Sequence, residues 1–186
     1  MSAVRNWLVK KLTELFPNSG TIITSNGQTA LFREWTGWDQ TSLGEQWACE
    51  LQYVDKNGRP LAVTTSCNAF LGQVVNKVRM AGGQAIQNFK SFNLPVAGGT
   101  AWHWYPDGDL KPQAGDFFQI GTRGGMYKHV GVILSISDDK WETVEGGQGG
   151  PSMGFDMIKR KGPAAFPPAS FMGWIDIDAF FGGWKG

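Results

Sequence analysis

The stretch TTSCNAFLGQVVNKVRMAGG, residues 64–83, decides the fold. Its apolar side chains recur three and four positions apart, the spacing of a helix buried along one side; they are Cys67, Phe70, Leu71, Val74, Val75 and Val78. Thr64, Thr65 and Ser66 are residue types that cap the start of a helix, and Gly82-Gly83 is typical of a helix end. The sequence therefore predicts a buried helix with Cys67 in its first turn.

Downstream of this helix the sequence is typical of an antiparallel sheet. Residues 129–136 (HVGVILSI) are rich in β-branched side chains and predict a central strand, with a short strand before it at 116–120. Turn-forming residues at 137–140 and a strand at 141–145 complete a hairpin. Further strands are expected at 152–158 and 173–177. Helices followed by a meander of strands indicate an α+β fold.

The N-terminal residues are expected to elaborate this core. One helical face carries the apolar side chains of Val4, Trp7, Leu8, Leu12, Leu15 and Phe16. Ser2 is placed to cap this helix and Pro17 to end it. Because the helix has modest charge, we expect it to dock on the domain's own core rather than on a membrane. Residues 18–46 are polar and punctuated by glycine, which favours loops and short strands.

Composition excludes several classes of protein. The 186 residues fit one domain, with residues 1–63 as an N-terminal elaboration and 64–178 as the catalytic core. The 41% hydrophobic and 18% charged residues argue against disorder, and a net charge of +1 argues against nucleic acid or anionic lipid as a partner. No apolar stretch is long enough for a membrane span, and the two histidines and two cysteines lack metal-binding spacing, so no metal or cofactor is expected.

Three residues together suggest thiol chemistry. The thiolate is the reactive form of cysteine, and a helix N-terminus and a neighbouring imidazolium both favour it. His129 opens the central strand, and Glu145 ends its hairpin partner, so both fall at one end of the hairpin. With Cys67 they would supply a nucleophile, a base and a carboxylate that orients the base. Each residue alone also fits a structural role, as a core thiol or a solvated polar group.

The second cysteine and the second histidine are weaker candidates. Cys49 follows no helix-start signal and is expected to be structural, and the sequence leaves open whether it forms a disulfide with Cys67. His103 lies between two tryptophans in a stretch expected to be irregular, which favours a loop or groove residue over a catalyst.

Three segments resemble the core of the NlpC/P60 and CHAP superfamily of papain-like cysteine amidases. They are KPQAGDFF at 111–118, HVGVI at 129–133 and TVEGGQGG at 143–150, and the resemblance covers about residues 64–150. It implies a papain-like fold, with the nucleophile at a helix N-terminus packed on a small antiparallel sheet. It also implies hydrolysis of peptidoglycan amides by Cys67, with His129 as the base.

The resemblance leaves two features of the site open. Either Glu145 or Gln148 would orient His129, because members of the CHAP branch carry an amide side chain close after the glutamate. The residue before Cys67 is not an aromatic or a glutamine, so the backbone N–H of Cys67 is the expected oxyanion donor. An aromatic substrate groove is one interpretation, and core packing the equal alternative, for Trp102, Trp104 and Tyr105.

The implied substrate lies outside the inner membrane, yet the N-terminal stretch shows no secretory signal. We therefore expect cytoplasmic synthesis and then delivery to the periplasm, or secretion, by a non-Sec route, as an antibacterial effector of a secretion system or as a phage-type lysin. An effector implies an immunity protein, an inhibitor that covers the Cys67 groove. Two alternatives are a thiol protease or deamidase toxin acting on a protein, and an inactive papain-like module that binds glycan or peptide.

Overall fold

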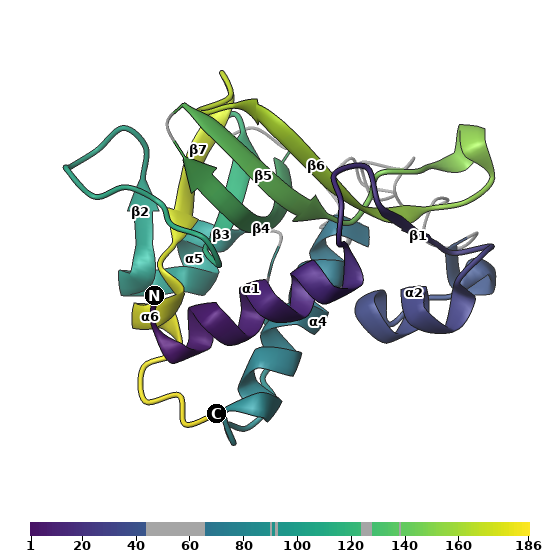
Figure 1. Ribbon diagram of the computed structural model, residues 1–186, viewed down its shortest axis with the longest axis horizontal. Helices are drawn as coiled ribbons and strands as arrows, with labels where there is room; N and C mark the ends of the chain where they lie inside the picture. The colour runs from purple at the N-terminus through teal and green to yellow at the C-terminus, as the bar shows by residue number, and fades with distance from the viewer. Residues whose placement is uncertain (44–65, 90, 92, 124–127, 138) are drawn as a thin grey trace, which may run out of the picture.

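The computed structural model describes residues 1–43, 66–89, 91, 93–123, 128–137 and 139–186 (Figure 1). Within these ranges the strands are β1 (Ile22–Thr24), β2 (Trp102–Trp104), β3 (Phe117–Gly121), β4 (Lys128–Ser137), β5 (Lys140–Glu145), β6 (Met157–Ala165) and β7 (Phe171–Ile175). They form one seven-stranded antiparallel sheet in the order β1-β6-β5-β4-β3-β7-β2. The α+β class expected from the sequence is confirmed.

The middle of the sheet is the predicted meander. β3, β4, β5 and β6 follow one another, and β4 lies at the centre of the sheet. The strand expected at 152–158 starts later, because a 3-10 turn (Pro151–Met153) and Gly154, whose φ is 73°, interrupt the extended chain before β6. The strand expected at 173–177 corresponds to β7, which lies inside the sheet between β3 and β2.

Helix α1 (Ala3–Leu15) forms where the sequence predicts it. The hydroxyl of Ser2 accepts a hydrogen bond from the backbone N–H of Arg5, and the helix ends before Pro17. Its buried apolar side chains are Val4, Leu8 and Leu12, so α1 docks on the domain core. No helix within the described ranges has the length and apolar character needed to cross a bilayer.

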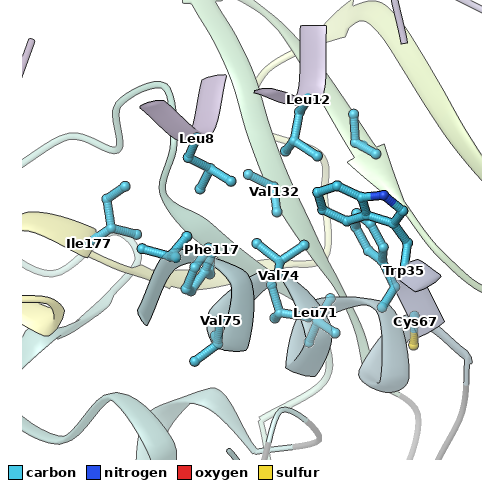
Figure 2. Close-up of a cluster of buried hydrophobic side chains, with 14 of the residues drawn as sticks. Leu8, Leu12, Trp35, Cys67, Leu71, Val74, Val75, Phe117, Val132 and Ile177 are labelled. Carbon is cyan, nitrogen blue, oxygen red and sulfur yellow. The ribbon is translucent and has the colours of Figure 1, made fainter. Parts of the chain in front are cut away.

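Helix α4 (Ser66–Ala81) packs beside α1 against the sheet. The predicted apolar stripe is buried: Cys67, Phe70, Leu71, Val74, Val75 and Val78. Figure 2 shows Leu8 and Leu12 of α1 facing Val74 of α4, with Val132 of β4 beside them. The helix ends at the predicted glycines: Gly83 is left-handed, with φ 66°, and the N–H of Gln84 donates to the carbonyl of Arg79. The caps expected at Thr64 and Thr65 lie outside the described residues.

Regular structure also occurs where the sequence predicts loops. Helix α2 (Thr29–Thr36) lies within residues 18–46, ends at Gly37 with φ 76°, and buries Phe32 and Trp35. Eight residues hold too few apolar positions for a helical period to be visible. The stretch expected to be irregular contains α5 (Leu94–Gly98), a 3-10 turn (Gly99–Ala101) and β2.

A second hydrophobic cluster covers the sheet face opposite α1 and α4. Its buried members are Phe118, Ile133, Trp141, Phe171 and Trp174. The rings of Phe118 and Trp141 pack edge to face, with 4.8 Å between their centroids, and the rings of Phe171 and Trp174 are stacked. Because both faces carry packed side chains, access to the candidate site lies at the strand ends, where the side chain of His129 is 24% exposed.

A buried ion-pair cluster ties α1 to the sheet and to α6 (Ile177–Phe180). The guanidinium of Arg5 lies 2.7 Å from Asp116, 2.6 Å from Asp176 and 2.7 Å from Asp178. Asp116 also accepts a hydrogen bond from the backbone N–H of Gln113, which closes the Pro-x-x-Gly-Asp turn. This turn therefore anchors the N-terminal helix to the sheet.

Candidate active site

Cys67 lies in the first turn of α4, at the edge of the core. It is 3% exposed, and Figure 2 shows its sulfur directed away from Leu71 and Val74. The first turn of a helix lies at the positive end of the helix dipole. This position favours a negative charge on the group that occupies it.

Two glycines bring the start of α4 against the end of β5. A Cβ atom at position 147 would lie 3.1 Å from the backbone nitrogen of Cys67, and one at position 146 would lie 2.7 Å from the carbonyl oxygen of Ser66. Gly147 also has φ +69°, a conformation that favours glycine. The approach of the turn to Cys67 therefore requires Gly146 and Gly147.

His129 and Glu145 lie side by side at the open end of the β4–β5 hairpin, as the sequence predicts. Nε2 of His129 is 2.8 Å from Oε2 of Glu145. Space for the carboxylate comes from Gly131, where a Cβ atom would lie 2.9 Å from Cγ of Glu145. A register shift between Ile133 and Ser135 adjusts the pairing of the two strands on the way to this end.

The thiol of Cys67 completes the arrangement. His129 shares a side-chain hydrogen bond with Cys67, and since Nε2 is engaged by Glu145, Nδ1 is the nitrogen left to face the sulfur. Burial lowers the pKa of His129, but the hydrogen bonds and negative charges of Cys67 and Glu145 raise it more, to about 9. The imidazole is therefore protonated at neutral pH and carries a positive charge next to the sulfur.

Glu145 is a buried and fully engaged carboxylate. Oε1 accepts a hydrogen bond from the hydroxyl of Thr143 at 2.5 Å, and Oε2 lies 3.0 Å from Nζ of Lys161. Burial raises the pKa of Glu145, but the hydrogen bond and charge of His129, with Thr143 and Lys161, lower it more, to about 2. Glu145 is therefore ionised throughout the neutral range.

Gln148 lies beside the same imidazole nitrogen. Its Nε2 is 3.3 Å from Nε2 of His129 and donates to the carbonyl of Gly146 at 3.3 Å. An amide nitrogen is a donor, and so is Nε2 of a histidine that donates to a carboxylate. The geometry therefore favours Glu145 over Gln148 as the group that orients His129.

Two residues of the site escaped the sequence analysis. Thr143 precedes Glu145 by two positions on β5, and the alternation of side chains along a strand is a signal that points to it. Lys161 reaches Glu145 from β6, and only the register of the β5–β6 pair reveals it.

The three aromatic candidates do not gather at Cys67. Trp102 and Trp104 lie on β2 and Tyr105 directly follows it, and β2 is separated from β4 by β7 and β3. Trp102 is 9% exposed and belongs to the hydrophobic core, so the core-packing interpretation applies to it rather than the groove interpretation. Trp104 is half-buried beneath the guanidinium of Arg123, at 4.3 Å. Tyr105 is exposed and packs its ring edge against Phe171.

The remaining candidates lie elsewhere. The ring of His103 lies against that of Trp174, tilted by 30° with 5.3 Å between the centroids, and β2, which carries it, is separated from β4 by β7 and β3. Cys49, and with it the question of a disulfide to Cys67, lies outside the described residues. Among the residues that the structure does describe, no group of three or more His, Cys, Asp or Glu side chains is placed to hold a metal ion.

The site thus combines a thiol at a helix start, an imidazolium and an ionised carboxylate, a set suited to nucleophilic attack on a carbonyl. Comparison of the chain with known protein families, characterised proteins and solved structures gives no match.

Proposed function

We propose that this chain is a cysteine hydrolase that cuts amide bonds, with Cys67 as nucleophile, His129 as general base and acid, and Glu145 as the orienting group. One observation carries the proposal: His129 hydrogen-bonds to Cys67 and to Glu145 at the same time. An imidazole held between a thiol and a carboxylate can keep the nucleophile ionised and later protonate the leaving group. A module that only binds ligand has no need of such a buried, charged set.

The reaction follows from these positions. The sulfur of Cys67 bonds to the carbonyl carbon of the amide, and the backbone N–H of Cys67, which lies beside Gly147, is the proposed donor to the oxyanion. The imidazolium of His129 gives its proton to the leaving nitrogen as the C–N bond breaks, which leaves a thioester. His129 then takes a proton from water, the water oxygen attacks the thioester, and a carboxylic acid and the thiolate–imidazolium pair are released.

The proposed substrate is peptidoglycan peptide, and the proposed fold family is the papain-like NlpC/P60 and CHAP core. Three resembling segments support this assignment. The chain order supports it as well, since the nucleophile helix α4 is followed by β3, by β4 with His129 near its start, and by β5 ending at Glu145. This is the order that the superfamily pattern implies.

A wall-cutting enzyme acts outside the inner membrane. We propose delivery to the periplasm of a competitor as an antibacterial effector, or release as a phage-type lysin, and for the effector a partner inhibitor that covers Cys67. Expression in a bacterium with and without an added export signal tests this: lysis only with the signal is expected. Equal toxicity from the cytoplasm would contradict a wall target.

A second candidate function is that of a thiol protease or deamidase toxin acting on a protein, because the tryptophans expected to form a groove for peptidoglycan are packed elsewhere. Trp102 in the core and Trp104 beneath Arg123 leave Tyr105 as the exposed member of the expected aromatic groove. The same thiol, imidazole and carboxylate would serve for a protein amide.

Digestion of purified sacculi separates these functions. The wild-type protein is expected to release new muropeptides, detected by mass spectrometry, and Cys67→Ala to release none. His103→Ala is the matched control, because it removes a histidine outside the site, and it is expected to cut like the wild type. Intact sacculi after treatment with active wild-type protein would overturn the wall assignment.

A further inference from the structure

The carboxylate of Glu145 is held by three donors. Thr143 occupies Oε1, and both Nε2 of His129 and Nζ of Lys161 lie within 3.0 Å of Oε2. Thr143 and Lys161 are register partners on β5 and β6, so their side chains lie on the same face of the sheet. The side chain of Lys161 is 46% exposed and that of Glu145 is 4% exposed. A cation therefore reaches from solvent to a buried anion.

His129 neutralises this anion during only part of the proposed reaction. Once the imidazolium has given its proton to the leaving nitrogen, it is neutral. Glu145 would then be a buried carboxylate without a counter-ion on its own hairpin, which is unfavourable. That cost would oppose the departure of the proton from His129.

We propose that Lys161 is a positioning residue, whose ammonium group keeps Glu145 ionised and directed at His129 through every stage of the reaction. The catalytic role of Lys161 rests on the proposed function. The coupling, by which the charge of Lys161 affects the protonation of His129 through Glu145, is a property of the protein without substrate. A nearby positive charge also disfavours a second one. Lys161 therefore makes the imidazolium of His129 a better acid toward the leaving group.

The charges that face His129 come from three elements. In the described part of the chain they are the thiol of Cys67 on α4, the carboxylate of Glu145 on β5 and the ammonium of Lys161 on β6. A second ammonium, that of Lys159 on β6, lies on the same face of the sheet and forms no ion pair among the described residues. The ring of Phe118 on β3 and the amide of Gln148 also lie beside it, and both are uncharged. Lys161 and His129 contact the same carboxylate oxygen, Oε2 of Glu145, so the positive charge of Lys161 is placed to influence the protonation of His129.

The same strand offers a matched control. Lys159 precedes Lys161 by two positions on β6 and is the register partner of Glu145, so it lies on the same face. Within the described residues Lys159 forms no ion pair, whereas Lys161 does. Lys159→Met removes an equal charge nearby without removing the contact.

Titration of the histidine ring carbons by NMR measures the coupling directly, since the chain has only two histidines and His103 serves as an internal reference. Lys161→Met is expected to raise the titration midpoint of His129 by roughly half a unit to one unit and to leave His103 unchanged. Lys161→Arg and Lys159→Met are expected to keep the wild-type midpoint. Lys161→Gln is the second neutral variant, should the Met variant fold poorly.

An unchanged or lowered midpoint in both neutral variants would overturn the inference, as would an equal shift in Lys159→Met. The hydrolytic role is measured separately: with a cleavable substrate, kcat of Lys161→Met should fall roughly two- to fivefold with little change in KM. A shifted midpoint in a protein that cuts no amide would refute the proposed function and leave the coupling established. An active wild type whose midpoint ignores Lys161 would refute the inference alone.

Discussion

The imidazole of His129 meets the carboxylate of Glu145 across the β4–β5 hairpin, with 2.8 Å between Nε2 and Oε2. Both groups are charged at neutral pH. The carboxylate of Glu145 stabilises the imidazolium of His129, and the imidazolium stabilises the carboxylate, inside a largely buried site. Because the pair engages Nε2, Nδ1 is the nitrogen left for the hydrogen bond of His129 with Cys67. The chemistry of the site therefore depends on the hairpin as well as on the helix that carries the thiol.

His129→Ala is expected to lower turnover by roughly 10²–10⁴-fold, the usual cost of losing a general base. Circular dichroism should show an intact fold, because the side chain lies at a strand end and is partly exposed. His103→Ala is the control and should retain activity. An active His129→Ala variant beside an inactive His103→Ala variant would place the base elsewhere.

Activity is expected to fall as pH rises through about 9, where His129 loses its proton. The pKa of His129 is raised in the fold above its ordinary 6.5. Its charge therefore contributes stability that is complete below pH 6.5 and lost as pH rises through about 9. Iodoacetate, an anion drawn to the imidazolium, should alkylate Cys67 with a rate that declines over the same range. A rate that climbs steadily beyond pH 10 would contradict the ion pair.

Glu145→Gln keeps the shape of the side chain and removes its charge. The pKa of His129 should then move down toward its ordinary value, because a charge and a hydrogen bond that raise it are weakened. The alkaline limit of the iodoacetate reaction should shift to lower pH. Gln148→Leu is the control, and it should leave that limit near the wild-type position if Glu145 is the orienting group.

Gly147→Ala is expected to reduce turnover by roughly 10²–10³-fold, because a methyl group would lie 3.1 Å from the backbone nitrogen of Cys67, the proposed oxyanion donor. Gly83→Ala is the matched control: its φ is +66°, close to the +69° of Gly147, and no atom lies within 4 Å of the added carbon. Both variants should lose thermal stability from backbone strain, and Gly147→Ala should lose more because its added carbon also meets the start of α4. Equal activity of the two variants would show that the glycine turn does not guard the oxyanion site.

Arg5→Met should lower the free energy of unfolding by about 3–5 kcal/mol, since it leaves the buried carboxylate of Asp116 without its partner. Arg33→Met is the control, because that side chain is 68% exposed and lies 3.8 Å from Asp39. Urea unfolding measures both. A small effect of Arg5→Met would mean that α1 is held by its apolar contacts alone.

The helix and the hairpin that hold the site were predictable because their patterns are long. The stripe of α4 runs from Cys67 to Val78 and the helix stops at Gly82-Gly83, and residues 129–145 show two strands around a clear turn. Helix α2 has eight residues and β2 has three. Both were missed, because a segment this short is too brief for a hydrophobic period to be recognised.

Of the contacts of Glu145, one was predictable from the sequence and another was not. Its pairing with His129 follows from counting back along one hairpin, which is local in sequence. Lys161 reaches it from the next strand over a connection that contains a 3-10 turn, and the register of that pair is set by tertiary packing. Trp102 shows the same limit, since sequence alone does not distinguish a core tryptophan from a groove tryptophan.

The most direct test of the central claim is mass spectrometry of muropeptides cut in water enriched in ¹⁸O. Amide hydrolysis through a Cys67 thioester predicts paired products, a new amine and a new carboxylic acid that carries one solvent oxygen, and predicts neither product with Cys67→Ala. Cleavage that persists in Cys67→Ala, or products that retain all amides and break in the glycan, would contradict the account.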